Sequence, residues 1–410
     1  MSKKEIKKYL EKMNAIQSCI LQYLEDNEQI EENYENFKKI IEDQKILEDQ
    51  HDFKSLLHLL IKIANNHYRC SNFFEKIESI LKLLQNSIKK YFSNNEIFNI
   101  FKYNKRILLF LFEEKIIEIN RSIVQQMQTF RFHHSKYNYY FYPEIKSYLK
   151  PEDKITFNEI GVNRDSSAQL KKEEKIPKDF NEKRKIGENH NEICRIIRND
   201  LIDEFINYVT QKKMLLNSKL EPSIYETNIF LNFYKTLYIM NNISLIEYAA
   251  FFGSIQIFKY LQKNGCKLTD DLWANAIHGN NTEIIHILEE KKIKPKNNSY
   301  EDLLKIAIAC HHNELANYIN TKYMKNKGGK MRSIFNKCLS HYNFAFMEEK
   351  LFDKDSFYQL CKYDYYLIAK ILLESPGIDV NQIIISFCHA FIQFHIFFFL
   401  IRMVTPMFQK

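Results

Sequence analysis

The stretch Ser244–Leu261, SLIEYAAFFGSIQIFKYL, predicts a short helix, a tight turn and a second helix. Ala249 and Ala250 are small at the place where two helices must approach closely, and Gly253 allows a turn without a steric penalty from Cβ. The apolar stripe of the second helix consists of Ile255, Phe258 and Leu261. This segment is therefore a candidate helix–turn–helix unit.

The same arrangement of a small or apolar pair, a turn and an apolar stripe returns along the chain. The further pairs are Ala276-Ile277, Ala307-Ile308, the weaker Cys338-Leu339 and Leu360-Cys361, and an upstream Ile196-Ile197. The alanine steps are 27 residues (249 to 276) and 31 residues (276 to 307). A unit of about thirty residues cannot bury its apolar face alone, so neighbouring units must stack. The predicted fold class is all-α, an α-solenoid of stacked helix–turn–helix repeats.

Composition supports this fold class. The chain has 410 residues, of which 8 are Gly and 7 are Pro, and none of these fifteen lies in residues 1–142. Because β-hairpin turns depend on such residues, the composition argues against a sandwich, barrel or propeller, and also against a glycine-rich phosphate loop. The net charge of +8 is interspersed along the sequence, which is typical of a solvated surface, so we expect no nucleic-acid partner.

Changes in apolar periodicity, proline content and charge divide the sequence into four regions. Residues 1–142 are predicted to form an N-terminal helical domain. One stripe of its first helix consists of Ile6, Leu10, Met13, Ile16, Ile20 and Leu24, and Asp52 is expected to cap a later helix. Residues 143–190 contain prolines and a charge run, which predict a linker or surface insertion. Residues 191–381 hold the repeats, and residues 382–410 form an apolar tail.

The repeat residues also carry a family resemblance. Ser244–Ala250 resembles the opening of an ankyrin repeat, and Gly253–Leu261 resembles its second half. The whole layout up to Asn381 is similar to a large family of ankyrin-repeat proteins of trichomonad protists, in which a helical domain of unknown function precedes divergent repeats. Leu245 and Glu247 replace the proline and histidine of the motif, and the repeat steps are shorter than the usual spacing of about 33 residues. The resemblance implies protein binding and no catalytic residues.

The sequence therefore predicts a non-enzymatic interaction scaffold that binds another protein through the concave surface of its repeats. The residues expected to contact the partner lie in short inter-repeat turns; they are Asp270, Asp271, Lys296, Asn297, Tyr300 and Glu301. Trp273 is the single tryptophan, and it is expected either to pack in the core or to anchor a partner on the concave surface.

The chain shows no pattern for a cofactor, a metal ion or a catalytic group, and we expect none. Its eight cysteines stand singly, which favours reduced thiols in a cytoplasmic protein. His133-His134 and His311-His312 lack the spacing of a metal motif and are expected at the surface or in turns. The loop Lys325–Ser333 lacks the glycine and the preceding strand of a phosphate loop, and instead predicts a basic attachment point for an acidic partner or anionic lipid.

The C-terminal tail leaves three alternatives open. Ile383–Ile401 are nineteen residues without a charged side chain, close to the length of about 20 residues that spans a membrane. One alternative is a membrane-associated adaptor anchored by this segment. Because His389, Gln393 and His395 are costly in hydrocarbon, a buried terminal helix pair is favoured instead. The third alternative is a misread coding end, since the repeat pattern stops after Asn381.

Overall fold

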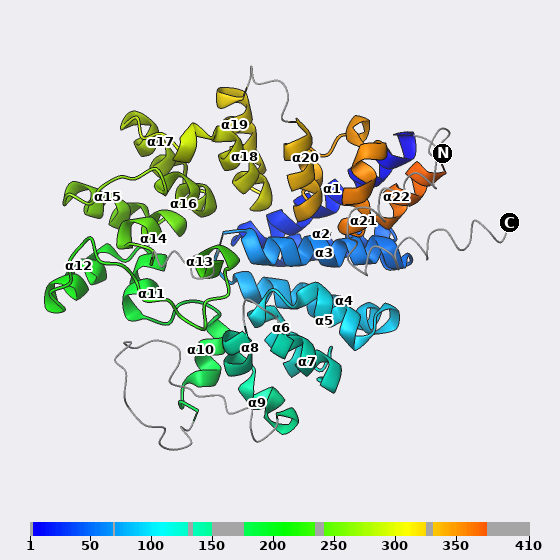
Figure 1. The fold of residues 1–410 in the computed structure, drawn as a ribbon, viewed down its shortest axis with the longest axis horizontal. Coiled ribbons are helices and arrows are strands. Elements are labelled where there is room, and N and C mark those ends of the chain that lie inside the picture. The colour runs from blue at the N-terminus through cyan, green and yellow to red at the C-terminus, as the bar shows by residue number, and fades with distance from the viewer. Residues whose placement is uncertain are drawn as a thin grey trace. The chain divides into compact units, whose positions relative to one another are not determined.

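The computed structural model describes residues 3–68, 70–129, 134–149, 176–233, 242–324 and 331–374. Within these ranges the chain is all-helical, with α-helices α1 to α22 and no β-strand (Figure 1). An isolated bridge pairs Lys219 with Ser244. The predicted all-α class is confirmed. The apolar tail at 382–410 lies outside the described residues.

The first nine helices precede residue 146. Their bounds are α1 Lys3–Glu25, α2 Ile30–Asp43, α3 Gln50–Asn66, α4 Phe73–Tyr91, α5 Asn94–Phe101, α6 Lys105–Glu113, α7 Arg121–Thr129, α8 His134–Tyr140 and α9 Tyr142–Ile145. The predicted stripe of α1 is its buried face, since all six of its residues are at most 5% exposed. Residues 1–142 contain no glycine, and the left-handed backbone conformation in turns of this region is adopted by Lys45, Asn72 and Lys115.

The predicted cap at Asp52 is wrong. Helix α3 begins at Gln50, and the carboxylate of Asp49 accepts hydrogen bonds from the backbone N–H groups of His51 (2.8 Å) and Asp52 (2.9 Å). Asp52 lies within the first turn, where it pairs with Lys12 of α1 at 2.5 Å. Both aspartates can satisfy the free N–H groups of a helix start, so the sequence alone left the choice open.

Six helix–loop–helix units occupy the predicted repeat region. The helical pairs are α11 Glu192–Arg198 with α12 Ile202–Gln211, α14 Leu245–Phe251 with α15 Ile255–Lys263, α16 Leu272–Gly279 with α17 Thr282–Glu290, α18 Tyr300–Ala309 with α19 Asn313–Tyr323, and α21 Phe357–Lys362 with α22 Tyr366–Leu373. In the remaining unit, α20 Met331–His341 is followed by the 3₁₀ turn η4, Phe344–Phe346. Two helices stand outside the pairs, namely α10 Phe180–Ile186 and α13 Ile229–Phe233.

Every one of these six units turns at a left-handed residue in the same place. These residues are Asp200, Gly253, Asn280, His311, Tyr342 and Asp364, with φ between 49° and 69°. In five units the next backbone N–H bonds to the carbonyl five residues earlier, at 2.9–3.1 Å, which closes the first helix in a Schellman-type end. Those acceptors are Ile196, Ala249, Ala307, Cys338 and Leu360, the first members of the pairs noted in the sequence.

The chain divides into two compact units. The terminal unit comprises Met1–Ile63, Cys70–Lys76 and Tyr300–Lys410, and the central unit comprises Ala64–Arg69 and Ile77–Ser299. The predicted ranges 1–142 and 191–381 therefore each contribute to both units. The last three helical pairs belong with α1 and α2 in the terminal unit, and the first three belong with α5 to α10 in the central unit.

Within the central unit the three pairs form two layers. The first helices α11, α14 and α16 pack in sequence, and the second helices α12, α15 and α17 pack beside them in the same order (Figure 1). Two glycines allow the closest approach, because a Cβ on Gly279 would lie 2.2 Å from the carbonyl oxygen of Ala250 and 2.8 Å from the nitrogen of Gly253. Ala250 thus lies at the close helix approach that the sequence predicts, and Gly253 forms the predicted turn with φ of 69°.

Candidate functional site

One hydrogen bond recurs between neighbouring helical pairs. The residue after the left-handed position donates from its side chain to a backbone carbonyl of the preceding pair. The four bonds are Ser254 Oγ to Ile197 O (2.5 Å), Asn281 Nδ2 to Gly253 O (2.9 Å), Asn343 Nδ2 to Ile308 O (2.9 Å) and Tyr365 Oη to Leu339 O (2.9 Å). The first two lie in the central unit and the last two in the terminal unit. Adjacent pairs are thereby held in a fixed register.

The structure brings together two of the predicted inter-repeat turns. Lys296 Nζ lies 3.3 Å from Asp271 Oδ1, which joins the turn before α16 to the turn before α18. Asp270 and Asn297 are exposed beside them, and Asn297 adopts a left-handed conformation. In the central unit, these two turns therefore lie side by side.

Lysine dominates the charge of this edge. The exposed lysines of the two turns and their flanks are Lys263, Lys267, Lys291, Lys292, Lys294 and Lys296. Within residues 263–271 and 291–299, the acidic residues are Asp270 and Asp271. We name these two ranges the basic turn edge. The turn residues predicted from the sequence include Lys296 but none of the other five lysines, so the shared positive charge of this edge was not predicted.

Tyr300 and Glu301 lie in the terminal unit, whereas the other four turn residues lie in the central unit. The Tyr300 ring stacks on Tyr323 with centroids 3.9 Å apart and planes 11° apart. Glu301 is 7% exposed and pairs with Lys305 at 2.7 Å. Both side chains thus have intramolecular contacts at the start of α18.

Trp273 is a core residue. Its side chain is 1% exposed, and its indole N–H donates to the carbonyl of Ile293 at 2.8 Å. This burial agrees with a core-packing role for Trp273 and not with an anchor on the concave surface. The tryptophan links the first helix of its pair to the turn that follows the second helix, and it presents no face to a partner.

Three histidines of the repeat region, His278, His311 and His312, are buried. His311 and His312 lie in the turn between α18 and α19, which confirms the turn position predicted for them, and they are 2% and 3% exposed rather than at the surface. His278 packs between Phe230 and Phe251, with ring centroids 4.2 Å and 5.0 Å away. His133 and residues 325–330 of the predicted attachment loop Lys325–Ser333 fall outside the described residues, whereas residues 331–333 form the start of α20 rather than a loop.

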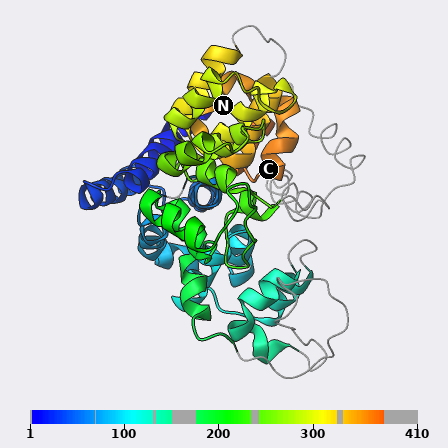
Figure 2. The same cartoon turned by 90° about the vertical axis from the view of Figure 1, so that its left-hand side faces the viewer.

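Helix α1 packs on the last repeats within the terminal unit (Figures 1 and 2). Gln17 is 0% exposed, donates to Asn343 Oδ1 at 3.1 Å and accepts from the backbone N–H of Phe344 at 2.8 Å. Asn343 also makes the inter-repeat bond to Ile308, so one buried amide joins α1 to two repeats. A terminal repeat has a free apolar side, and α1 covers part of it here.

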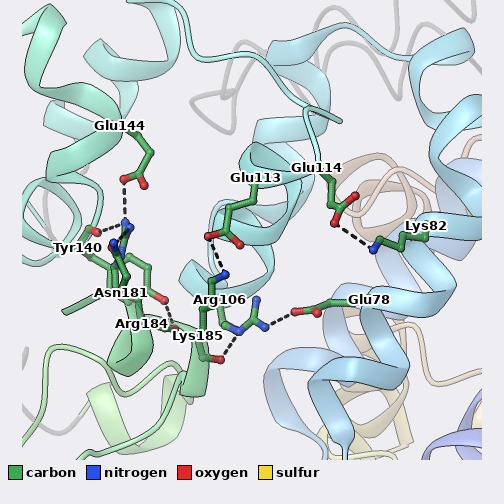
Figure 3. Close-up of polar contacts among 10 residues, drawn as sticks. All are labelled: Glu78, Lys82, Arg106, Glu113, Glu114, Tyr140, Glu144, Asn181, Arg184 and Lys185. Atoms are coloured by element: carbon green, nitrogen blue, oxygen red, sulfur yellow. Dashed lines mark hydrogen bonds and ion pairs between the residues drawn. The ribbon is translucent and has the colours of Figure 1, made fainter. Parts of the chain in front are cut away.

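Two buried arginines organise a polar network in the central unit (Figure 3). Arg106 of α6 is 7% exposed, pairs with Glu78 and donates from Nε to the carbonyl of Lys185. Arg184 of α10 is 3% exposed and donates to Glu144 Oε2 (2.8 Å) and to the carbonyl of Tyr140 (2.8 Å). Buried charges require such partners because their desolvation is costly.

The network attaches α10 to the helices that precede residue 146. Tyr140 returns a hydrogen bond to the carbonyl of Arg184 at 2.8 Å, and Lys185 pairs with Glu113 at 3.5 Å (Figure 3). Burial raises the pKa of the Tyr140 hydroxyl above its ordinary value, which keeps this donor protonated. No sequence pattern indicated these pairs, since their members lie about 30 to 80 residues apart.

Among the described residues, no group of three or more His, Cys, Asp or Glu side chains is arranged to hold a metal ion. The seven described cysteines form no disulfide. Burial raises the pKa of Cys194, Cys310 and Cys338 to about 12, so these thiols stay protonated near neutral pH. None of the helices in the described ranges has the length and apolar content needed to cross a membrane.

Comparison of the chain with protein-family models, with curated proteins and with solved structures found no match. The ankyrin resemblance therefore rests on the sequence motifs alone.

Proposed function

We propose that this chain is a non-enzymatic interaction scaffold whose six helix–loop–helix units are divergent ankyrin-type repeats. The observation that carries this proposal is the hydrogen bond that runs, in four of the six units, from the residue after the left-handed turn to the preceding unit. The donor holds the same position in all four units, and the acceptor is the second residue of the preceding pair in three of them, Ile197, Ile308 and Leu339. Such recurrence is typical of repeats that stack on their neighbours. The shortened turns and the 3₁₀ turn in the fifth unit make the repeats divergent.

The basic turn edge is the proposed docking surface, and its partner is a protein with an acidic segment. The edge carries six exposed lysines against two aspartates, and its turns lie side by side through the Asp271–Lys296 pair. Such a surface steers an acidic partner and gives binding that weakens as salt rises. Trp273, being buried, is not part of this surface.

Quantitative affinity purification tests the scaffold proposal. The full chain serves as bait beside the double variant Lys291→Glu with Lys294→Glu, which reverses two exposed charges of the basic turn edge. The matched control is Lys7→Glu with Lys8→Glu, the same charge change on an exposed part of α1. We expect at least one co-purifying protein to fall about tenfold with the edge variant and not with the control. Equal recovery with all three baits would refute the proposed surface.

A membrane-tethered form of the scaffold is the second candidate, favoured by the uncharged run Ile383–Ile401. Deleting residues 382–410 and fractionating cells tests it. A tethered protein would move from the membrane fraction to the soluble fraction on deletion, and an unchanged distribution would eliminate this candidate.

A further inference from the structure

A third turn of the central unit adjoins the basic turn edge. Residues 211–219 follow α12, whereas the two turns of the edge follow α15 and α17. The thiol of Cys266 donates a hydrogen bond to the carbonyl of Leu216 at 3.3 Å, so the third turn contacts residues 263–271. Those residues also contact the turn on their other side, through the carboxylate of Asp271. The three turns therefore form a row, in the order in which their helices pack (Figure 1).

All three turns begin with the same backbone geometry. A left-handed residue lies two positions after the end of each helix, with φ between 51° and 86°. The next backbone N–H bonds to the carbonyl five residues earlier, at 2.9–3.0 Å, in every turn of the row. The position directly after this N–H is therefore equivalent in the three turns. It is occupied by Leu215, Lys267 and Lys294.

The side chain at this equivalent position is exposed in each turn. Leu215 is 71% exposed, the highest value among the large apolar side chains of the described ranges. The backbone around it is fixed, because its carbonyl accepts from the N–H of Ser218 at 2.9 Å and Lys219 forms the bridge with Ser244. A partner can cover an apolar side chain on a fixed backbone without the entropic cost of ordering a loop.

The added turn increases the positive charge of the row. Residues 211–219 carry three lysines and no acidic residue, so the three turns hold nine lysines and two aspartates, a net charge of +7 against +8 for the whole chain. Counting the flanking Glu221 and Glu290 reduces this surplus to +5. The dipole of a helix stabilises lysines in or next to its last turn, whereas Lys267 and Lys294 lie four residues beyond the helix end. Helix ends therefore do not explain the two lysines at the equivalent position.

We propose that the acidic segment that docks on the basic turn edge also carries an apolar side chain, which packs on Leu215. This inference rests on the proposed scaffold function and defines the class of its partner. Neighbouring helices pack about 9 Å apart and an extended chain advances about 3.3 Å per residue, so one segment along the row meets successive turns with side chains about three residues apart. The matching segment has an apolar residue at one end and acidic residues at this spacing.

The order of the row favours a peptide over a lipid surface. Leu215, Lys267 and Lys294 present one apolar and two basic positions in a fixed sequence, at the spacing of the repeats. An extended peptide can match that sequence residue by residue, with its acidic side chains on the lysines. A fluid bilayer of anionic lipids attracts the lysines equally but does not distinguish their order.

Fluorescence anisotropy with labelled peptides tests the inference on the full chain. One probe carries a leucine with pairs of glutamates three and six residues later, and a second probe has the reverse order. We expect the wild type to bind one of the two about tenfold more tightly than the same peptide with serine in place of leucine, because a leucine is buried. Leu215→Ser should lose this preference and keep its affinity for the serine peptide. Leu83→Ser, at a 38% exposed leucine of α4, is the control and should keep the preference.

The double variant Lys291→Glu with Lys294→Glu separates this inference from the scaffold proposal. If it weakens all acidic peptides while the wild type binds leucine and serine peptides equally, the role of Leu215 is overturned and the basic docking surface stands. If the wild type binds none of the peptides, both fail. Co-sedimentation with vesicles of phosphatidylserine and phosphatidylcholine covers the remaining case. Vesicle binding that is lost with Leu215→Ser, without a leucine preference among the peptides, would assign the row to a membrane surface and overturn the proposal.

Discussion

Gly279 and Ala250 lie so close across α16 and α14 that a Cβ on the glycine would be 2.2 Å from the carbonyl oxygen of the alanine. The neighbouring obstacle is backbone, which cannot rotate away as a side chain can. The contact therefore specifies both a glycine on one helix and a narrow spacing between two repeats.

Gly279→Ala should destabilise the central unit by about 2–3 kcal/mol, because the added methyl group forces two backbones apart. Urea unfolding followed by far-ultraviolet circular dichroism measures the change. The matched control is Gly265→Ala, where nothing lies within 4 Å of the added Cβ and φ is +86°. Its cost should come from backbone strain alone, about 1 kcal/mol. Equal losses for the two variants would contradict the close-approach argument.

Asn343→Ala should release α1 from the last repeats as well as lower stability. The substitution leaves the buried groups of Gln17 and Ile308 without their present partner, at a cost of about 2–3 kcal/mol. Hydrogen exchange measured by mass spectrometry should show faster exchange in α1, residues 3–25. Asn320→Ala, at an exposed position of α19, should leave α1 protected. Unchanged exchange in α1 with Asn343→Ala would show that Gln17 does not fasten this helix.

Arg184→Met should weaken the attachment of α10. Removing one member of a buried pair leaves Glu144 and the carbonyl of Tyr140 without a donor, and such a loss costs about 3–5 kcal/mol. The comparison is Arg195→Met, whose side chain is 43% exposed and pairs with Glu192 and Glu204. An exposed pair contributes about 0–1 kcal/mol, so its midpoint in urea should barely move. Similar midpoints for both variants would mean that the buried network adds little stability.

The terminal unit should lose stability on mild acidification. Burial lowers the pKa of His58 to about 4 from its ordinary value of 6.5, while Asp364 acts in the opposite direction. The unfolded chain then takes up a proton that the folded chain does not, so stability is full above about pH 6.5 and falls towards pH 4. The loss should be at most about 3 kcal/mol.

His58→Gln should flatten this pH dependence, measured as urea midpoints between pH 7.5 and 4.5. His286→Gln, at a side chain that is 61% exposed, should leave the profile as it is. A profile of His58→Gln that parallels the wild type would assign the acid sensitivity to other groups, such as His341, whose pKa burial also lowers.

The sequence by itself determined the all-helical class and the position of most helical pairs. Apolar periodicity is a local property, so the stripe of α1 and the pairs at Ala249, Ala307 and Cys338 could be read before the fold was known. The left-handed residue was foreseen at Gly253, where glycine marks it. It was not foreseen at His311, Tyr342 or Asp364, because these residues adopt that conformation only when the surrounding structure imposes it.

The tertiary structure alone decided which segments share a core. Gln17 and Asn343 are 326 residues apart, and Arg184 and Tyr140 are 44 apart; no local pattern selects such partners. The division into a terminal and a central unit and the burial of Trp273 have the same origin. Periodicity fixes which face of a helix is apolar, whereas the choice of the neighbour that covers it depends on packing and charge complementarity across the whole chain.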